Sequence, residues 1–192
     1  MQVNITFLSK MEVMWEADYL KRHKASGPDG LSPSLFKDRG EALVSELTKL
    51  LWVIWDRERI PREWCKSVIV PIHKKGDRSS CENHRGISLV SIASKLLTGL
   101  ILHRLSSARE MRTRENQAGF RSGRGCMDHI FTLRQTLEHR HIFCRPITSV
   151  FLDSKAAFDL VYRTVLWRCI PLKGVPEKVI FHFQWLYANS RS

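Results

Sequence analysis

The amino-acid sequence predicts an α+β fold in which several helices surround a small, incomplete antiparallel sheet. Apolar residues recur at the three- and four-residue spacing of a helix along most of the chain. Only residues 67–73 and 147–152 are short, β-branched and apolar enough to be strands. The 192 residues are 43% hydrophobic and 26% charged, which suits a globular core. Two strands make a thin sheet for such a chain, so we expect further strands to be missing.

The first sixty residues predict two helices separated by turns. Apolar residues among charges indicate a short helix within residues 11–24. Residues 24–33 hold two glycines and two prolines and predict a turn-rich segment. From Glu41 onward leucines recur at helical spacing, and Pro61 marks the end of this second helix or the turn after it.

The middle of the chain predicts a strand, a loop tip and a long helix. Pro71 makes the strand at residues 67–73 an edge strand, or confines its pairing to one side, because proline has no N–H for a ladder. The Lys-Lys-Gly-Asp sequence at 74–77 predicts a hairpin or loop tip. Leucines and isoleucines at helical spacing predict a helix over residues 92–105.

The last third begins with a glycine- and arginine-containing loop, residues 119–125, and a helix over residues 127–137. Residues 147–152 are almost wholly apolar and predict a central strand. We expect a helix to follow that strand at once, with Phe158 on its apolar stripe, and a last helix to follow Pro176.

The formal charge of +12 is concentrated in the middle of the chain. Residues 1–60 are neutral, residues 61–125 carry +8 and residues 126–192 carry +4. A basic middle favours a polyanionic partner, with nucleic acid or nucleotide phosphate as the obvious candidates. The alternative is a surface that only keeps the protein soluble, and membranes and acidic proteins attract basic patches too.

No apolar run reaches the roughly eighteen residues that cross a bilayer, and the first residues lack the blocks of a signal peptide. We therefore expect an intracellular protein of the cytoplasm or nucleus without membrane contact. Five cysteines, an odd number without a C-x-x-C pair, argue against a disulfide framework and a zinc site.

Asp153 stands directly after the predicted central strand and before a predicted helix, where the sites of α/β proteins gather. The free N–H groups of residues 155–158 would begin that helix and could bind phosphate. A carboxylate beside such amides suits Mg²⁺ and a triphosphate, because Mg²⁺ prefers oxygen ligands. The alternative is that Asp153 or Ser154 only caps the helix, and the turn by itself favours the cap.

Five motifs, found in order along the chain, favour the metal-site interpretation of Asp153 over the helix cap. They are Lys24-Ala-Ser-Gly-Pro-Asp-Gly-Leu31, Trp64 with Val-Ile-Val-Pro-Ile-His-Lys-Lys-Gly-Asp77, Asn83-His-Arg-Gly-Ile-Ser-Leu89, Gln117-Ala-Gly-Phe-Arg-Ser-Gly-Arg124 and Phe151-Leu-Asp-Ser-Lys-Ala-Ala-Phe-Asp159. Spread over residues 11–190, they resemble the reverse transcriptases of non-LTR (LINE-type) retrotransposons, especially their RTE-like branch. The fifth is similar to the first metal-binding motif of that family.

The resemblance implies the fingers and part of the palm of a right-hand polymerase. Residues 1–40 would form an N-terminal helix and turn-rich lead-in, residues 41–140 a fingers-like region and residues 141–192 a partial palm. The partners would be an RNA template, a DNA primer and dNTPs, and no obligate protein partner is evident.

The resemblance also implies roles for the fifth motif. Asp153 would be the catalytic residue and would coordinate Mg²⁺, aided by the carbonyl of Ser154. Ala156 and Ala157 would offer backbone N–H groups to the triphosphate. Phe158 would be the steric gate that favours dNTPs, and a place in the core is the open alternative or addition for its ring.

Basic residues of the other motifs would contact phosphate. Arg85 would reach the incoming triphosphate, whose oxygens a guanidinium can hold with two hydrogen bonds. Lys74 or Lys75 would add a charge at the fingers tip, and a merely solvated hairpin tip is the alternative. Arg121 and Arg124 would touch the template or primer backbone.

The sequence departs from the family in one decisive way. Nothing in it matches the family's glycine-rich nucleotide-binding segment or its Ala-Asp-Asp hairpin. Because two-metal transfer needs carboxylates on both sides of the metals, we expect a domain fragment with negligible polymerase activity by itself. A non-catalytic nucleic-acid-binding remnant and a chain that cannot fold stably are the alternatives.

Overall fold

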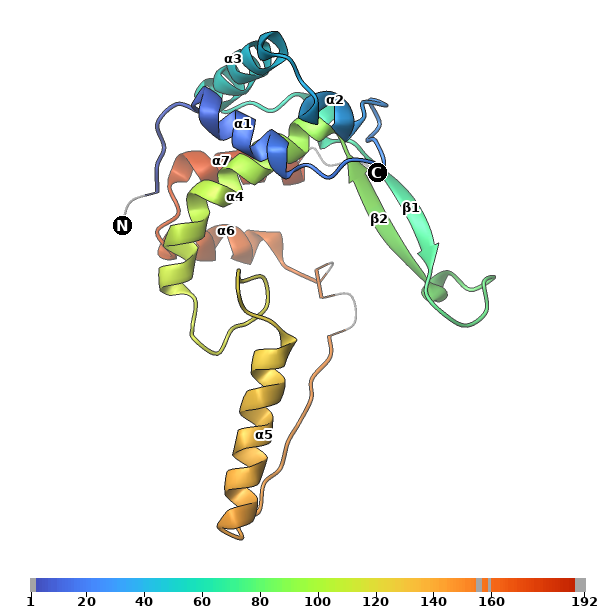
Figure 1. Cartoon of the computed structure of the whole chain (residues 1–192), viewed down its shortest axis with the longest axis vertical. Coiled ribbons are helices and arrows are strands. Elements are labelled where there is room, and N and C mark those ends of the chain that lie inside the picture. Colours follow the sequence, from blue (N-terminus) through green and yellow to red (C-terminus); the bar gives the residue numbers. More distant parts are fainter. Residues whose placement is uncertain (1–2, 155–156, 159, 189–192) are drawn as a thin grey trace.

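The computed structural model describes residues 3–154, 157, 158 and 160–188. Most helices gather in one body, from which the β1–β2 ribbon and helix α5 project (Figure 1). The elements are α1 (Lys10–Tyr19), α2 (Pro33–Lys37), α3 (Glu41–Arg57), η1 (Arg62–Cys65), β1 (Ser67–His73), η2 (Cys81–Asn83), β2 (His84–Val90), α4 (Ile92–Arg112), α5 (Cys126–Ile142), α6 (Arg163–Leu172) and α7 (Glu177–Ala188). Helices therefore outweigh a two-stranded antiparallel sheet.

One apolar core holds α1, α3, α4 and α7 together. Each of these helices turns an apolar stripe inward, because its buried residues recur at three- and four-residue spacing. Burial of these side chains is the main force that holds the body together. The fully or almost fully buried members include Val13, Leu51, Trp55, Ile92, Leu96, Leu97, Ile101 and Val179. The helices predicted from Glu41, over residues 92–105 and after Pro176 are thus confirmed.

A buried ion pair fixes α1 on α4. Arg104 Nε and Nη2 donate to the two carboxylate oxygens of Glu12 at 2.7 and 2.8 Å, and only 4% of the Arg104 side chain is exposed. The Ser9 N–H donates to the same carboxylate, and the Ser9 hydroxyl accepts from the Glu12 N–H, so that Ser9 caps α1. Burial alone would raise the pKa of Glu12, but the hydrogen bonds from Arg104 and Ser9 lower it to about 2. These charge-assisted hydrogen bonds therefore hold the start of α1 against α4.

His182 fixes α7 against α3. Its buried ring stacks on Trp55, with the ring centres 4.8 Å apart. Nδ1 lies 2.7 Å from the carbonyl oxygen of Lys178, whereas Nε2 has no hydrogen-bond partner among the described residues. Burial lowers the pKa of this imidazole, because the charged form is poorly solvated there. His182 therefore belongs to the core as a neutral ring.

Strands β1 and β2 pair in register from Ser67–Val90 to His73–His84, and residues 74–83 join them. The strand predicted at residues 67–73 is confirmed, as is the loop tip that follows it. Strand β2 was not predicted, because glycine and polar residues weaken its β-forming signal. Ile69 and Ile72, which point to opposite faces, are 50% and 48% exposed, so both faces of the ribbon are open.

The turn-rich segment 24–33 packs against the junction of β2 and α4. A Cβ at Gly27 would lie 2.5 Å from the carbonyl carbon and oxygen of Val90 and 2.6 Å from the nitrogen of Ser91. Gly30, farther along the segment, has a φ of +69°, which glycine adopts without strain. The first sequence motif thus meets the backbone directly after the third motif through a glycine that leaves no room for a side chain.

Residues 147–152 do not form the predicted central strand. They run without ladder partners, and Phe151 and Leu152 are 82% and 92% exposed. The helix expected directly after Asp153 begins only at Arg163, and Phe158 lies in a turn, 80% exposed, rather than on a buried stripe. An apolar run becomes a strand only beside another strand that satisfies its N–H and C=O groups. Within the described chain, β1 and β2 pair only with each other.

Helix α5 confirms the helix predicted over residues 127–137 and extends away from the body (Figure 1). The Asp128 carboxylate accepts a hydrogen bond from the Gly125 N–H at 2.8 Å and thereby caps its first turn. The helix has no buried residue, and Met127 is 75% exposed. No helix in the described ranges is long and apolar enough to cross a membrane.

Candidate nucleic-acid and nucleotide interface

The loop between β1 and β2 is held by its own hydrogen bonds. The Lys74 N–H donates to the Asn83 carbonyl at 2.8 Å, and the Asn83 side-chain amide donates to the Asp77 carbonyl at 2.8 Å. Gly76 has a φ of +84°, which allows the tight turn at the tip. Lys74 and Lys75 are exposed at this tip. The loop therefore presents two ammonium groups on an internally braced support.

Arg85 lies on β2 opposite Ile72, so both side chains leave the same face of the ribbon. Arg85 is exposed and has no hydrogen bond or ion pair with any described residue. Its guanidinium is free to hold an external phosphate.

Arg121 differs from the other predicted phosphate contacts. Its guanidinium pairs with Glu110 of α4 and donates to the carbonyls of Arg114, Glu115 and Gln117. Only 8% of its side chain is exposed. Arg121 thus ties the glycine- and arginine-containing loop to α4, whereas Arg124 is exposed. Contact of either arginine with the template or primer stays a prediction. To make such a contact, Arg121 would have to give up its bonds to Glu110 and to the three carbonyls.

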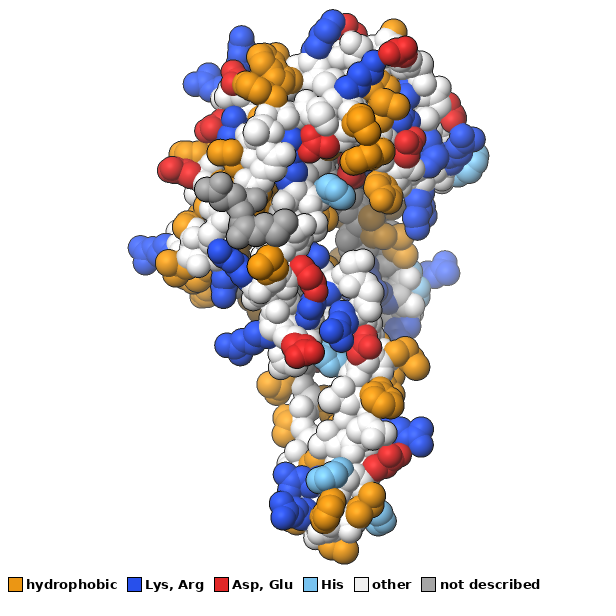
Figure 2. All heavy atoms as spheres, turned by 60° about the vertical axis from the view of Figure 1, so that its left-hand side comes forward, with side chains coloured by type: hydrophobic (Ala, Val, Ile, Leu, Met, Phe, Trp, Pro, Cys, Tyr) orange, Lys and Arg blue, Asp and Glu red, His pale blue; other side chains and the backbone are white. Residues whose placement is uncertain are grey.

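A basic cavity of about 350 Å³ opens beside this loop. Arg109, Arg112 and Lys173 contribute to its lining. Arg109 Nε is buried and has no hydrogen-bond partner among the described residues, which leaves a donor available to an anion. Sequence reasoning missed these three residues; the run of arginines at the end of α4 was a signal for Arg109 and Arg112, and Lys173 after α6 had none. Figure 2 shows Lys and Arg side chains spread from the body to the projecting end of the molecule.

The glycine- and arginine-containing loop meets the segment after Asp153 through two aromatic rings. Phe120 and Phe158 lie edge to face, with centres 6.1 Å apart and planes at 82°. Each ring is at least 80% exposed, so this contact forms on the surface. Ala157 lies beside Phe158 in the same turn, and Ala156 lies outside the described residues.

Asp153 itself is exposed in the extended segment before this turn, as is Ser154. It has no hydrogen bond or ion pair with a described residue. The expected phosphate site at a helix N-terminus is not formed by residues 157 and 158, because they lie in a turn.

Comparison with known proteins identifies the family to which the chain belongs. Residues 72–191, well over half of the chain, match the family described as reverse transcriptase (RNA-dependent DNA polymerase). The chain belongs to the reverse transcriptase family. The match begins in β1 and contains Lys74, Arg85, Arg121 and Asp153.

Relatives of this reverse transcriptase chain are proteins of transposons. It is 23% identical to the Transposon TX1 uncharacterized 149 kDa protein of Xenopus laevis, over 89% of this chain and 13% of that protein. It is 28% and 27% identical to the Probable RNA-directed DNA polymerases from transposon BS and transposon X-element of Drosophila melanogaster, over 79% and 84% of this chain. These alignments span 17% and 18% of the two fly proteins, so the chain covers less than a fifth of each of these three relatives. The predicted resemblance to non-LTR retrotransposon reverse transcriptases is confirmed.

Reverse transcriptases use divalent metal ions, and the described residues do not by themselves fit a two-metal site. No group of three or more His, Cys, Asp or Glu side chains able to hold a metal gathers among them. Asp153 is the one carboxylate of the fifth motif among the described residues, and Mg²⁺ in such sites is shared between carboxylates, substrate phosphates and water.

Proposed function

We propose that this chain is the fingers and the beginning of the palm of an RNA-directed DNA polymerase from a non-LTR retrotransposon. Residues 1–40 serve as the lead-in, residues 41–140 as the fingers-like region and residues 141–192 as the partial palm. One observation carries the proposal: a single family match runs from the basic loop tip to the Asp153 segment.

The ribbon is the proposed nucleotide-facing part of the fingers. Arg85 projects from a braced two-stranded ribbon, and Lys74 and Lys75 stand at its tip. A guanidinium holds phosphate with directed hydrogen bonds, whereas the lysines add point charges. Together they would bind the triphosphate of an incoming dNTP.

The Phe158 turn is the proposed nucleotide-facing part of the palm. Its ring is exposed and contacts Phe120, so it can present an edge to a sugar as the steric gate requires. The Ala157 N–H beside it, with that of Ala156, would bind the triphosphate. Asp153 and the Ser154 carbonyl would supply one side of the Mg²⁺ site.

Primer extension tests this proposal. The chain is incubated with an RNA template, a DNA primer, dNTPs and Mg²⁺, beside the variant Asp153→Ala. We expect no extension by either, because no group of three or more possible metal ligands gathers among the described residues. Template-dependent extension that is lost in Asp153→Ala would overturn the expected inactivity of this chain.

Nucleotide binding separates the polymerase proposal from a general affinity for anions. A fluorescent dNTP analogue is titrated into the chain, into Arg85→Gln and into Arg62→Gln, which removes one exposed charge outside the ribbon. We expect weaker binding by about tenfold in Arg85→Gln and little change in Arg62→Gln. Equal losses in both variants would contradict a specific role for Arg85.

A second candidate function is nucleic-acid binding without catalysis, and the basic cavity at the end of α4 favours it. It predicts that affinity for an RNA–DNA duplex falls with salt. Arg112 and Arg114 both line the cavity, so Arg112→Gln with Arg114→Gln should lower the log–log slope by about 1 for each lost phosphate contact. Lys49→Gln, which removes a charge paired with Glu46 on α3, is the matched control. A nearly flat salt response would exclude this function.

A further inference from the structure

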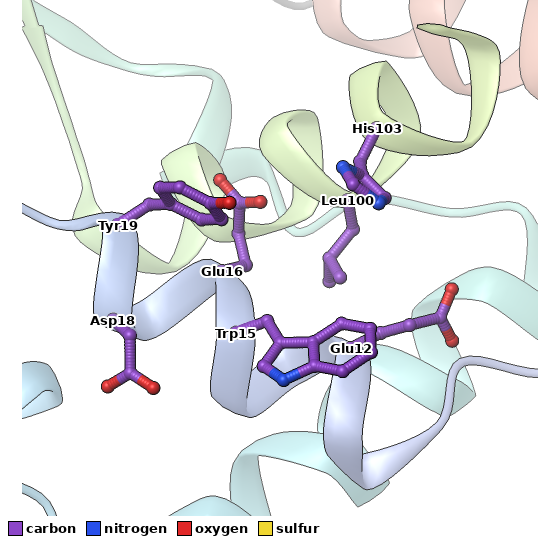
Figure 3. Close-up of a pocket in the computed structure, with 7 residues that line it drawn as sticks. All are labelled: Glu12, Trp15, Glu16, Asp18, Tyr19, Leu100 and His103. Carbon is purple, nitrogen blue, oxygen red and sulfur yellow. The ribbon is translucent and has the colours of Figure 1, made fainter. Parts of the chain in front are cut away.

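A cavity of about 470 Å³ lies between α1 and α4. Figure 3 shows its lining, to which α4 contributes Leu100 and His103 and α1 contributes the other side chains. The α1 side chains are the acidic Glu12, Glu16 and Asp18 and the aromatic Trp15 and Tyr19. An acidic and aromatic lining is unusual on a chain with a formal charge of +12.

Only one of the three carboxylates has no hydrogen bond or ion pair with a described residue. Glu12 is held by Arg104, and Asp18 accepts from Arg39 at 3.0 Å. Asp18 also points away from Leu100 and His103 in Figure 3. Glu16 has no hydrogen bond or ion pair with any described residue. The cavity therefore offers one carboxylate that no hydrogen bond or ion pair of the described residues holds, with His103 as a charged neighbour.

The fold makes a place for this carboxylate. A Cβ at Gly99 of α4 would overlap Glu16 Oε1 and Cδ, so the carboxyl group rests directly on the glycine. Glycine inside a helix is less favourable than alanine, but here it leaves the space that the carboxylate occupies. Burial raises the pKa of Glu16, and the charge of His103 opposes that rise. A cation that enters the cavity would restore the solvation that Glu16 loses by burial.

Two aromatic rings stand beside this charge. Trp15 is 53% and Tyr19 is 75% exposed, although both are large apolar side chains on a helix that packs into the core. Tryptophan and tyrosine attract cations through their ring faces, and tryptophan is the strongest of the side chains in this respect. Trp15, Tyr19 and the Glu16 carboxylate line the same cavity, and this combination is a chemical match for a planar cation.

We propose that the cavity between α1 and α4 binds an arginine side chain of a protein partner. The carboxylate disfavours phosphate, so the cavity is no part of a nucleic-acid path. Arginine fits better than lysine, because its flat guanidinium stacks on an aromatic ring while it donates two parallel hydrogen bonds to one carboxylate. The ligand class is thus a basic peptide segment, with one arginine as its anchor.

The test is an NMR titration of the whole chain with the peptide acetyl-Gly-Gly-Arg-Gly-Gly-amide. The matched peptide carries citrulline, which has the shape of arginine without its charge. We expect the arginine peptide to shift the indole N–H signal of Trp15 and the ring signals of His103, and the citrulline peptide to leave them in place.

Variants decide whether the cavity is responsible. Glu16→Gln keeps the size of the side chain and should weaken binding by about tenfold, and Trp15→Leu should weaken it through the lost ring face. Glu138→Gln, on the projecting helix α5, makes the same charge change away from the cavity and should have no effect. Thermal unfolding verifies that each variant is folded. The proposal is overturned if the arginine peptide produces no shift, if citrulline acts equally, or if Glu16→Gln binds like the parent chain.

Discussion

Gly27→Ala tests whether the turn-rich segment must pack directly on the backbone after β2. The new Cβ would lie 2.5 Å from the carbonyl carbon and oxygen of Val90, about 0.9 Å closer than the 3.4 Å at which ordinary contact begins. Both neighbours are backbone atoms, so no side chain can rotate away. Either the segment or the β2–α4 junction has to move, and overpacking of this kind costs about 1–3 kcal/mol.

Two other glycines separate this clash from the general effect of alanine. At Gly30 a Cβ meets nothing within 4 Å, but φ is +69°, so alanine there should cost about 1 kcal/mol through backbone strain alone. At Gly119 a Cβ lies 3.7 Å from the Gln117 side chain in ordinary contact, and alanine should be neutral within about 0.5 kcal/mol.

Urea unfolding of the parent chain and the three variants gives the free energies of unfolding. Hydrogen exchange at the Ser91 and Ile92 amides reports the same junction locally, and we expect faster exchange there in Gly27→Ala. The packing argument fails if Gly27→Ala loses no more stability than Gly119→Ala and exchanges at the parent rate.

Three further perturbations follow from polar contacts of single side chains. Arg104→Ala leaves the part-buried Glu12 carboxylate without its cation and should cost about 1.5–3 kcal/mol in urea unfolding. Because the pKa of Glu12 is lowered to about 2, the stabilisation is complete above about pH 4.5 and is lost as the pH falls toward 2. This loss should be absent in Glu12→Gln. The pKa of His182 is lowered on folding, so the parent chain loses stability as the pH falls below about 6.5, and His182→Phe should remove this part of the acid sensitivity. Thermal unfolding of both chains at about pH 7.5 and pH 5.5 measures the effect. An equal change of the unfolding temperature in both chains would refute this prediction. Asp128→Ala removes the cap of α5 and should destabilise that helix by about 1 kcal/mol, measured as faster exchange of its first-turn amides; an unchanged rate would contradict the capping role.

Local sequence was enough wherever a pattern needs no distant partner. The apolar spacing from Glu41 and over residues 92–105 predicted α3 and α4, because a helix satisfies its own N–H and C=O groups and turns one stripe inward. The Lys-Lys-Gly-Asp tip was likewise predictable, since glycine at a positive φ permits the turn. The exposure of Lys74, Lys75 and Arg85 follows from their charge.

Strands and contacts between segments were decided by tertiary structure. Residues 147–152 have the composition of a central strand, yet they form none without a neighbouring strand, whereas β2 forms from a weaker sequence because β1 lies beside it. The sequence likewise carries no sign that Arg121 is occupied by Glu110 or that Phe120 meets Phe158.

The five motifs, read in order, determined the family of this chain. The tertiary structure decided what its charged residues can do, because the same side chain is a free ligand, as at Arg85, or an internal brace, as at Arg104, according to what the fold packs against it. Only the fold could show that Glu16, one acid among three on α1 in this lining, is the one without a hydrogen bond or ion pair to a described residue, in a cavity that two aromatic side chains also line.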